Sequence, residues 1–177
     1  MARPTTKRRL RDIDPDEFGR DVAERVKAHV TDLFSDEDTD IARIIARHHD
    51  AVAEEAGLLA QYARDGGFNA ERAGHMLLTV RVWLYSCAAR TSHATIGKLD
   101  GSPNDDIGIV LLAAHARVRL GRGEAVPVRE LACLASVDPD HVRLLARQGQ
   151  MALISGGVIA PQIAKQWLET RGVALPS

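Results

Sequence analysis

The sequence predicts a mainly α-helical protein, in which an N-terminal bundle of helices is followed by a C-terminal helix-turn-helix with a short β-hairpin. Three observations lead to this fold class. Apolar residues recur at helical spacing through most of residues 14–120. The segment 126–172 contains two short apolar helices around a tight turn. Within that segment, Gly156-Gly157 stands between apolar residues, which is typical of a two-residue hairpin turn.

The chain begins with a basic segment. Residues 1–13 are polar, contain Pro4 and show no apolar periodicity, so we expect a disordered arm. Its candidate DNA contacts are Arg8, Arg9 and Arg11, because a basic arm can lie along phosphates or in a minor groove. A solubilising tail has the same composition, and the sequence leaves both interpretations open. No hydrophobic segment follows the charges, so the arm does not resemble a secretory signal.

Residues 14–120 are expected to form a helical domain that dimerises or binds a partner. Asp14 and Asn69 stand where N-caps of the first and third helices are expected. The third helix is apolar on most sides, with Leu78 and Val82 outside its main stripe, which predicts the centre of the bundle. The expected helices span about 14–34, 40–63, 69–87 and 105–120, with an irregular loop at 92–104 and a short hinge at 121–123.

Residues 124–177 are predicted to form the second domain. Its first two helices are expected at Val128–Ala135 and Pro139–Gln148. Asp138 precedes Pro139, and this order is a strong helix-start signal because Asp accepts hydrogen bonds from free backbone N–H groups and Pro has none to leave unpaired. Gly149 is then suited to end the second helix in a left-handed conformation.

This domain resembles the winged helix-turn-helix of MerR-like and phage excisionase-like DNA-binding domains over about the last third of the chain. The helix pair reads RELACLASVDPDHVRLLARQG, the expected wing hairpin reads MALISGGVI, and the helix after it reads APQIAKQWLETRG. The resemblance implies a fold that binds double-stranded DNA. Two departures stand out: Ser136 occupies the turn position where Gly is usual, and the wing has no Arg or Lys.

The second helix of the pair is the expected recognition helix. Arg143 and Arg147 lie one turn apart and can reach guanine edges or phosphates, and His141 near the helix start can contact a base or a phosphate. Arg129, and Thr170 or Arg171, are expected to contact phosphates. The predicted DNA-binding residues of this domain are Arg129, Asp140, His141, Arg143, Leu144, Arg147, Gln148 and Arg171.

Other chemistry has weaker signals. His48-His49-Asp50, with Glu54 and Glu55 one turn on, does not have the spacing of a tight metal site. We expect His48 on the apolar face of its helix and His49 pointing away. The sequence shows no nucleophile with a matching base and no glycine-rich loop for phosphates. It therefore predicts neither an enzyme nor a cofactor or metal site.

Composition limits the possible partners. The net charge of −1 argues against indiscriminate nucleic-acid binding. Only Cys87 and Cys133 are present, which favours a reducing cytoplasm, and no apolar run is long enough to span a membrane.

The leading hypothesis is a sequence-specific DNA-binding transcriptional regulator or mobile-element accessory protein, which forms a homodimer through its N-terminal helices. A second hypothesis is a protein-interaction adaptor or inhibitor of the phage or plasmid type, which uses the helix-turn-helix without binding DNA. A third is a sensor with an apolar small-molecule pocket between the N-terminal helices.

Overall fold

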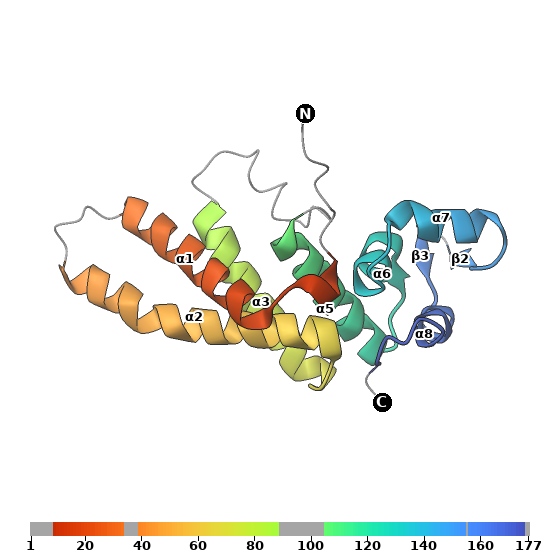
Figure 1. Ribbon diagram of the computed structural model, residues 1–177, viewed down its shortest axis with the longest axis horizontal. Helices are drawn as coiled ribbons and strands as arrows, with labels where there is room; N and C mark the ends of the chain where they lie inside the picture. Colours follow the sequence, from red (N-terminus) through yellow and green to blue (C-terminus); the bar gives the residue numbers. More distant parts are fainter. Residues whose placement is uncertain (1–8, 34–38, 89–104, 155, 176–177) are drawn as a thin grey trace.

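A computed structural model describes residues 9–33, 39–88, 105–154 and 156–175. The protein is mainly helical and has one small antiparallel sheet (Figure 1). The helices α1, α2, α3 and α5 lie at one end of an elongated molecule, and α6, α7, α8 and the sheet lie at the other. Among the described residues, no helix is both long enough and apolar enough to cross a membrane.

Two of the N-terminal helices, α1 and α3, begin at the caps that the sequence predicts. Asp14 accepts from the backbone N–H of Glu17 over 2.8 Å, and Asn69 accepts from that of Arg72 over 2.8 Å. Asp105 caps the last of these helices by accepting from Ile107 N–H, also over 2.8 Å. The elements are the 3₁₀ helix η1 (Leu10–Asp12) and the helices α1 (Pro15–Leu33), α2 (Thr39–Asp65), α3 (Ala70–Ala88) and α5 (Asp106–Gly121).

The C-terminal part contains the predicted helix pair, hairpin and last helix, each within a few residues of its expected bounds. The sheet also has a strand that the sequence analysis missed, because Val126-Pro127 pairs antiparallel with the second hairpin strand, Val126 opposite Ile159. The sheet order is β1-β3-β2. The elements are β1 (Val126–Pro127), α6 (Val128–Leu134), α7 (Pro139–Arg147), β2 (Leu153–Ile154), β3 (Val158–Ile159) and α8 (Pro161–Glu169).

The central helix is α5, and the prediction of a central third helix is wrong. Leu78 and Val82 of α3 are exposed, whereas α5 is buried on nearly all sides. Small residues explain this difference, since Gly108 and several alanines let neighbouring helices approach α5 closely. Helix α5 packs against α1, α2 and α3 on one side and against α6, β1 and α8 on the other. Its buried side chains therefore belong to one core that spans the described chain.

The expected disordered arm ends earlier than predicted. Residues 9–13 form η1 and its flanks, with Leu10 and Ile13 buried in the core against α2 and α5. These two side chains are three positions apart, so one short turn places both on the same face. The remainder of the predicted arm, residues 1–8 with Arg8, lies outside the described residues, as does the predicted 92–104 loop.

The two histidines of α2 have the opposite orientations to those predicted. His48 is exposed, and the partly buried His49 places Nε2 3.0 Å from Oε1 of Glu24 on α1. The physical reason is that α1 packs along this part of α2, on the side that His49 occupies. Periodicity identified an apolar face along the whole helix, but the neighbour that covers each turn is decided by packing.

Candidate nucleic-acid interface

Two capped ends set the angle between α6 and α7. Helix α6 ends in a Schellman motif: Ser136 N–H donates to the Cys133 carbonyl over 3.1 Å, and Val137 N–H to the Ala132 carbonyl over 3.0 Å. This motif requires a left-handed residue, and Ser136 has a φ of 54°. Asp138 then accepts from the backbone N–H of Asp140 and starts α7, as predicted. The buried Val142 and Leu131 pack the two helices into the core.

Helix α7 presents a polar face to solvent. All six of the residues predicted on it are exposed, namely Asp140, His141, Arg143, Leu144, Arg147 and Gln148. The helix is not uniformly basic, because Nη1 of Arg143 lies 2.6 Å from Oδ1 of Asp140. At 100° per residue, Arg143 and Arg147 lie on one flank of the exposed face, and His141 lies on the opposite flank.

A groove runs along the first flank, between α7 and the hairpin. We call it the hairpin groove. Three arginines line it together: Arg129 from the start of α6, and Arg143 and Arg147 from α7. Its other walls are apolar or glycine, including Met151, Leu153 and the Gly156-Gly157 turn. The hairpin bears no cation, but it forms one side of a groove in which the three arginines meet.

A second hollow lies at the opposite flank, around the α6–α7 turn, and we call it the turn groove. Its basic side chains are Arg9 and Arg11 from the η1 segment, His141 from α7 and Arg171 from the end of α8. Arg171 stacks on the ring of Trp167, with the guanidinium carbon 4.5 Å from the ring centroid. Its Nη2 also lies 3.0 Å from Nε2 of His141.

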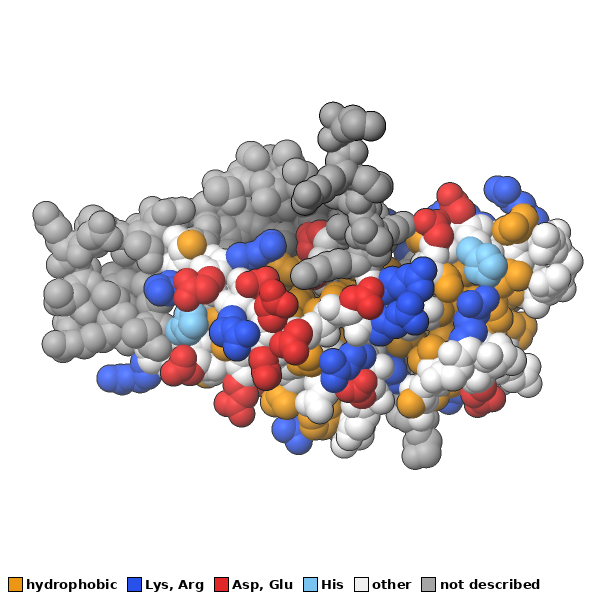
Figure 2. All heavy atoms as spheres, in the orientation of Figure 1, with side chains coloured by type: hydrophobic (Ala, Val, Ile, Leu, Met, Phe, Trp, Pro, Cys, Tyr) orange, Lys and Arg blue, Asp and Glu red, His pale blue; other side chains and the backbone are white. Residues whose placement is uncertain are grey.

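Tertiary packing brings these predicted residues together in a way the sequence could not show. Arg9 and Arg11 lie about 130 positions before His141 in the chain, yet they line the same groove. Figure 2 shows Lys and Arg side chains gathered between the N-terminal helices and the α6–α8 part of this face, with apolar side chains exposed among them. Over α1 and α2, by contrast, acidic and basic side chains alternate.

The sequence analysis missed an apolar component of this surface. Leu144 of α7 and Leu153 and Ile154 of β2 have exposed fractions of 47%, 43% and 50%. Strand β2 is the edge strand of the sheet among the described residues, so no described strand lies along one of its sides. The glycine pair in MALISGGVI predicted a hairpin, but the pattern did not show that Leu153 and Ile154 would remain exposed.

The α6–α7 pair is fixed to the central helix by a buried carboxylate. Oε1 of Glu130 on α6 lies 3.1 Å from Nδ1 of His115, and Oε2 lies 3.2 Å from Nε of Arg119, both on α5. Arg119 also reaches Glu124 in the connection between the two helices, at 3.5 Å. Arg119 therefore makes charged contacts with residues that follow the predicted hinge at 121–123, and these contacts join α5 to α6.

Within the described residues, no three His, Cys, Asp or Glu side chains cluster in a way that could hold a metal ion. Comparison of the chain with protein families, curated proteins and solved structures found no match. The proposed function is therefore based on the surface around α7.

Proposed function

We propose that α6, α7 and the hairpin form a winged helix-turn-helix and that the protein binds double-stranded DNA with α7 in the major groove. The observation that carries this proposal is the placement of arginines on both flanks of one exposed helix. Arg129, Arg143 and Arg147 line the hairpin groove on one flank, and Arg9, Arg11 and Arg171 line the turn groove on the other. A helix in a major groove has a phosphate strand on each side, and the arginines of both grooves complement this pattern, although Asp12 and Asp138 also line the turn groove.

The position of each residue would decide whether it contacts bases or phosphates. Asp140 and Leu144 lie on the middle of the exposed face of α7, where base edges would be, and Leu144 can contact a thymine methyl group. Gln148, the C-cap of α7, lies nearer the flank of His141. Arg143 and Arg147 are placed to reach guanine edges or the nearer phosphates. Arg129, Arg171 and the η1 arginines would position the backbone without reading sequence. His141, whose Nε2 lies 3.0 Å from Nη2 of Arg171, would contact the DNA together with that arginine.

This division supports a sequence-specific regulator of transcription, or an accessory protein of a mobile element, and a binding function without catalysis. The proposal includes a homodimer through the N-terminal helices, because one small module buries little DNA surface and specific affinity usually requires two half-sites. Sedimentation of the full chain would test the dimer independently of DNA.

The direct test is fluorescence anisotropy with genomic fragments, including the DNA upstream of its own gene, at two salt concentrations. Specific binding should remain at the higher salt for one fragment, whereas binding through phosphates alone falls steeply. The variant Arg143→Ala with Arg147→Ala should weaken specific binding by at least about tenfold. The matched control is Arg20→Ala with Arg25→Ala, which removes the same charge from exposed positions of α1.

Equal losses in the two double variants would assign the effect to net charge and contradict the role of α7. Unchanged affinity of the α7 variant for a confirmed site would reject the recognition helix outright. Absence of binding to any fragment at low salt would reject the proposal as a whole.

A second candidate function is supported by the exposed apolar residues Leu144, Leu153 and Ile154. A protein-interaction adaptor or inhibitor would use this patch with its Asp140–Arg143 pair against another protein. The variant Ile154→Ser separates the two functions, since it shortens the apolar patch, leaves all the arginines in place and adds no charge. Loss of DNA binding in that variant would not be expected, whereas loss of a captured protein partner would.

A further inference from the structure

A groove outside the proposed DNA interface lies between α3 and α5. It has an apolar floor formed by the buried Leu77 and Val118. Leu78 and Val82 form its rim one helical turn apart, and their exposed fractions are 61% and 51%. Among the described large hydrophobic residues, these two have the highest exposed fractions. Two such side chains on one helix face constitute a surface that a partner molecule could cover.

The charged lining of this α3–α5 groove is cationic. Arg81 of α3 and Arg122, the C-cap of α5, line it beside His115, which is already paired with Glu130 through Nδ1, and no described Asp or Glu lines it. Gly74 contributes by its lack of a side chain, since a Cβ there would lie 2.9 Å from Nη2 of Arg122. The Arg122 guanidinium can therefore lie directly against α3 at one end of the groove.

Charge and size identify the kind of occupant. A second copy of the same groove is disfavoured, because a symmetric contact would bring the arginines of both copies together without a described carboxylate between them. An apolar floor with cationic side chains complements a molecule that has an apolar body and an anionic group. The groove has a volume of about 490 Å³, which is in the range of small-molecule sites.

We infer that the α3–α5 groove binds a small amphipathic anion, of the class of medium-chain or aromatic carboxylates. Its apolar body covers Leu78 and Val82 and its carboxylate faces Arg81 and Arg122. This site does not depend on DNA binding, so the failure of either proposal leaves the other intact.

Isothermal titration calorimetry of the full chain with decanoate tests the inference. Decyltrimethylammonium is the matched probe, because its alkyl chain is of nearly the same length and its charge is opposite. Decanoate should bind with one site per chain, and decyltrimethylammonium should bind at least about tenfold more weakly. Equal affinity for the two probes, or no binding of decanoate at millimolar concentration, would overturn the inference.

Variants then locate the site. Leu78→Glu removes apolar rim and adds a negative charge at an exposed position, so it should weaken decanoate binding about tenfold or more without affecting the core. Ile154→Glu makes the same exchange on the exposed hairpin and should leave decanoate binding unchanged. Arg122→Gln should weaken decanoate and leave decyltrimethylammonium unaffected. Equal effects of Leu78→Glu and Ile154→Glu would place the binding elsewhere.

Sedimentation of the same variants distinguishes a protein occupant. If the chain binds no decanoate and Leu78→Glu abolishes its self-association, the groove is an interface between copies and the inference is wrong.

Discussion

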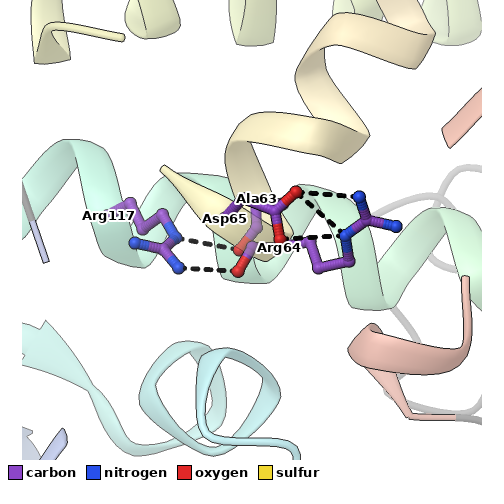
Figure 3. A network of polar contacts seen from close by, with 4 residues as sticks. All are labelled: Ala63, Arg64, Asp65 and Arg117. Atoms are coloured by element: carbon purple, nitrogen blue, oxygen red, sulfur yellow. Dashed lines mark hydrogen bonds and ion pairs between the residues drawn. The ribbon is translucent and has the colours of Figure 1, made fainter. Parts of the chain in front are cut away.

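The guanidinium of Arg117 donates to the backbone carbonyl of Ala63 over 2.8 Å, although the two residues are 54 positions apart. It also donates to the carbonyls of Arg64, over 2.9 Å, and of Ala174. Figure 3 shows Arg117 beside the end of α2, where Arg64 is paired with Asp65. The last carbonyls of a helix lack hydrogen-bond donors within the helix, and the negative end of the helix dipole lies there. A guanidinium at this end supplies the missing donors and a favourable positive charge.

This arginine is fully buried on the central helix, and no described carboxylate pairs with it directly. Burial lowers the pKa of the Arg117 guanidinium, while the charges of Tyr62 and Asp65 act in the opposite direction. We expect Arg117→Met to lower the free energy of unfolding by about 2–4 kcal/mol, because several carbonyls lose a charged donor. Urea denaturation measures the change, and Arg122→Met at the exposed end of the same helix should cost under about 0.5 kcal/mol. An unchanged midpoint for Arg117→Met would mean that burying the charge costs as much as its hydrogen bonds contribute.

The buried Glu130 is predicted to hold α6 on α5. Glu130→Gln keeps the size of the side chain and removes the charge facing Arg119, so it should destabilise the protein by about 1–3 kcal/mol. Glu124→Gln removes a more exposed partner of the same arginine and should cost less than about 1 kcal/mol. A double-mutant cycle of Glu130→Gln with Arg119→Gln should give a coupling of about 0.5 kcal/mol or more, and additive effects would argue against the pair.

A glycine in the second turn of α1, Gly19, marks a close crossing with α2. A Cβ on Gly19 would overlap the backbone oxygen of Ala53. Replacing a Gly inside a helix by Ala ordinarily stabilises the folded protein by up to about 1 kcal/mol. Overpacking against the backbone of a neighbouring helix, however, costs about 1–3 kcal/mol. We therefore expect Gly19→Ala to lower the melting temperature.

Gly74→Ala is the control, because the atom in its way is the mobile end of the Arg122 side chain and the substitution should be neutral or stabilising. Equal stabilisation by both substitutions would show that α1 and α2 can separate without cost.

The left-handed Ser136 is predicted to be a site of backbone strain. A φ of 54° costs a non-glycine residue about 1–2 kcal/mol. Glycine would remove this strain, but part of the gain would be lost because glycine has more conformational freedom in the unfolded chain. Ser136→Gly should therefore stabilise the protein by about 0.5–1 kcal/mol. Ser136→Val should destabilise it, since a β-branched side chain is poorly accommodated there. Thermal unfolding of both variants measures the effect, and changes of the same sign would contradict the interpretation.

The η1 arginines are expected to contribute affinity without specificity. Removal of residues 2–11 would also delete the buried Leu10, so Arg9→Ala with Arg11→Ala is the cleaner test. This variant should weaken binding to specific and unrelated DNA alike, and should reduce the salt slope by about two phosphate contacts. Loss confined to the specific fragment would instead indicate base contact. Unchanged binding to both would remove the turn groove from the interface.

The sequence was most informative where the signal is local. The caps at Asp14, Asn69 and Asp138 were predicted and are present, because a capping oxygen needs only the N–H groups two or three residues ahead. The hairpin itself is present and both glycines have positive φ, but the predicted two-residue turn is wrong, because Ile154 pairs with Val158 and three residues separate these partners.

Errors arose where burial depends on a distant neighbour. Periodicity could not show that α3 leaves Leu78 to solvent, or that His49 rather than His48 would face α1. The role of Arg117 had a signal that was missed: it falls three positions after Ala114 and seven after Val110, within the apolar stripe of α5. A charge at such a position predicts a buried partner, but not which one.

The sequence by itself determined the helices, their caps and the exposed residues of α7, because these depend on interactions within a few residues. Tertiary structure alone decided that α5 is the centre of the core, that Val126 completes a sheet, and that Arg9 shares a groove with His141. The physical reason is that each of these follows from packing between segments far apart in the chain, where the shape and volume of the whole core select the neighbour.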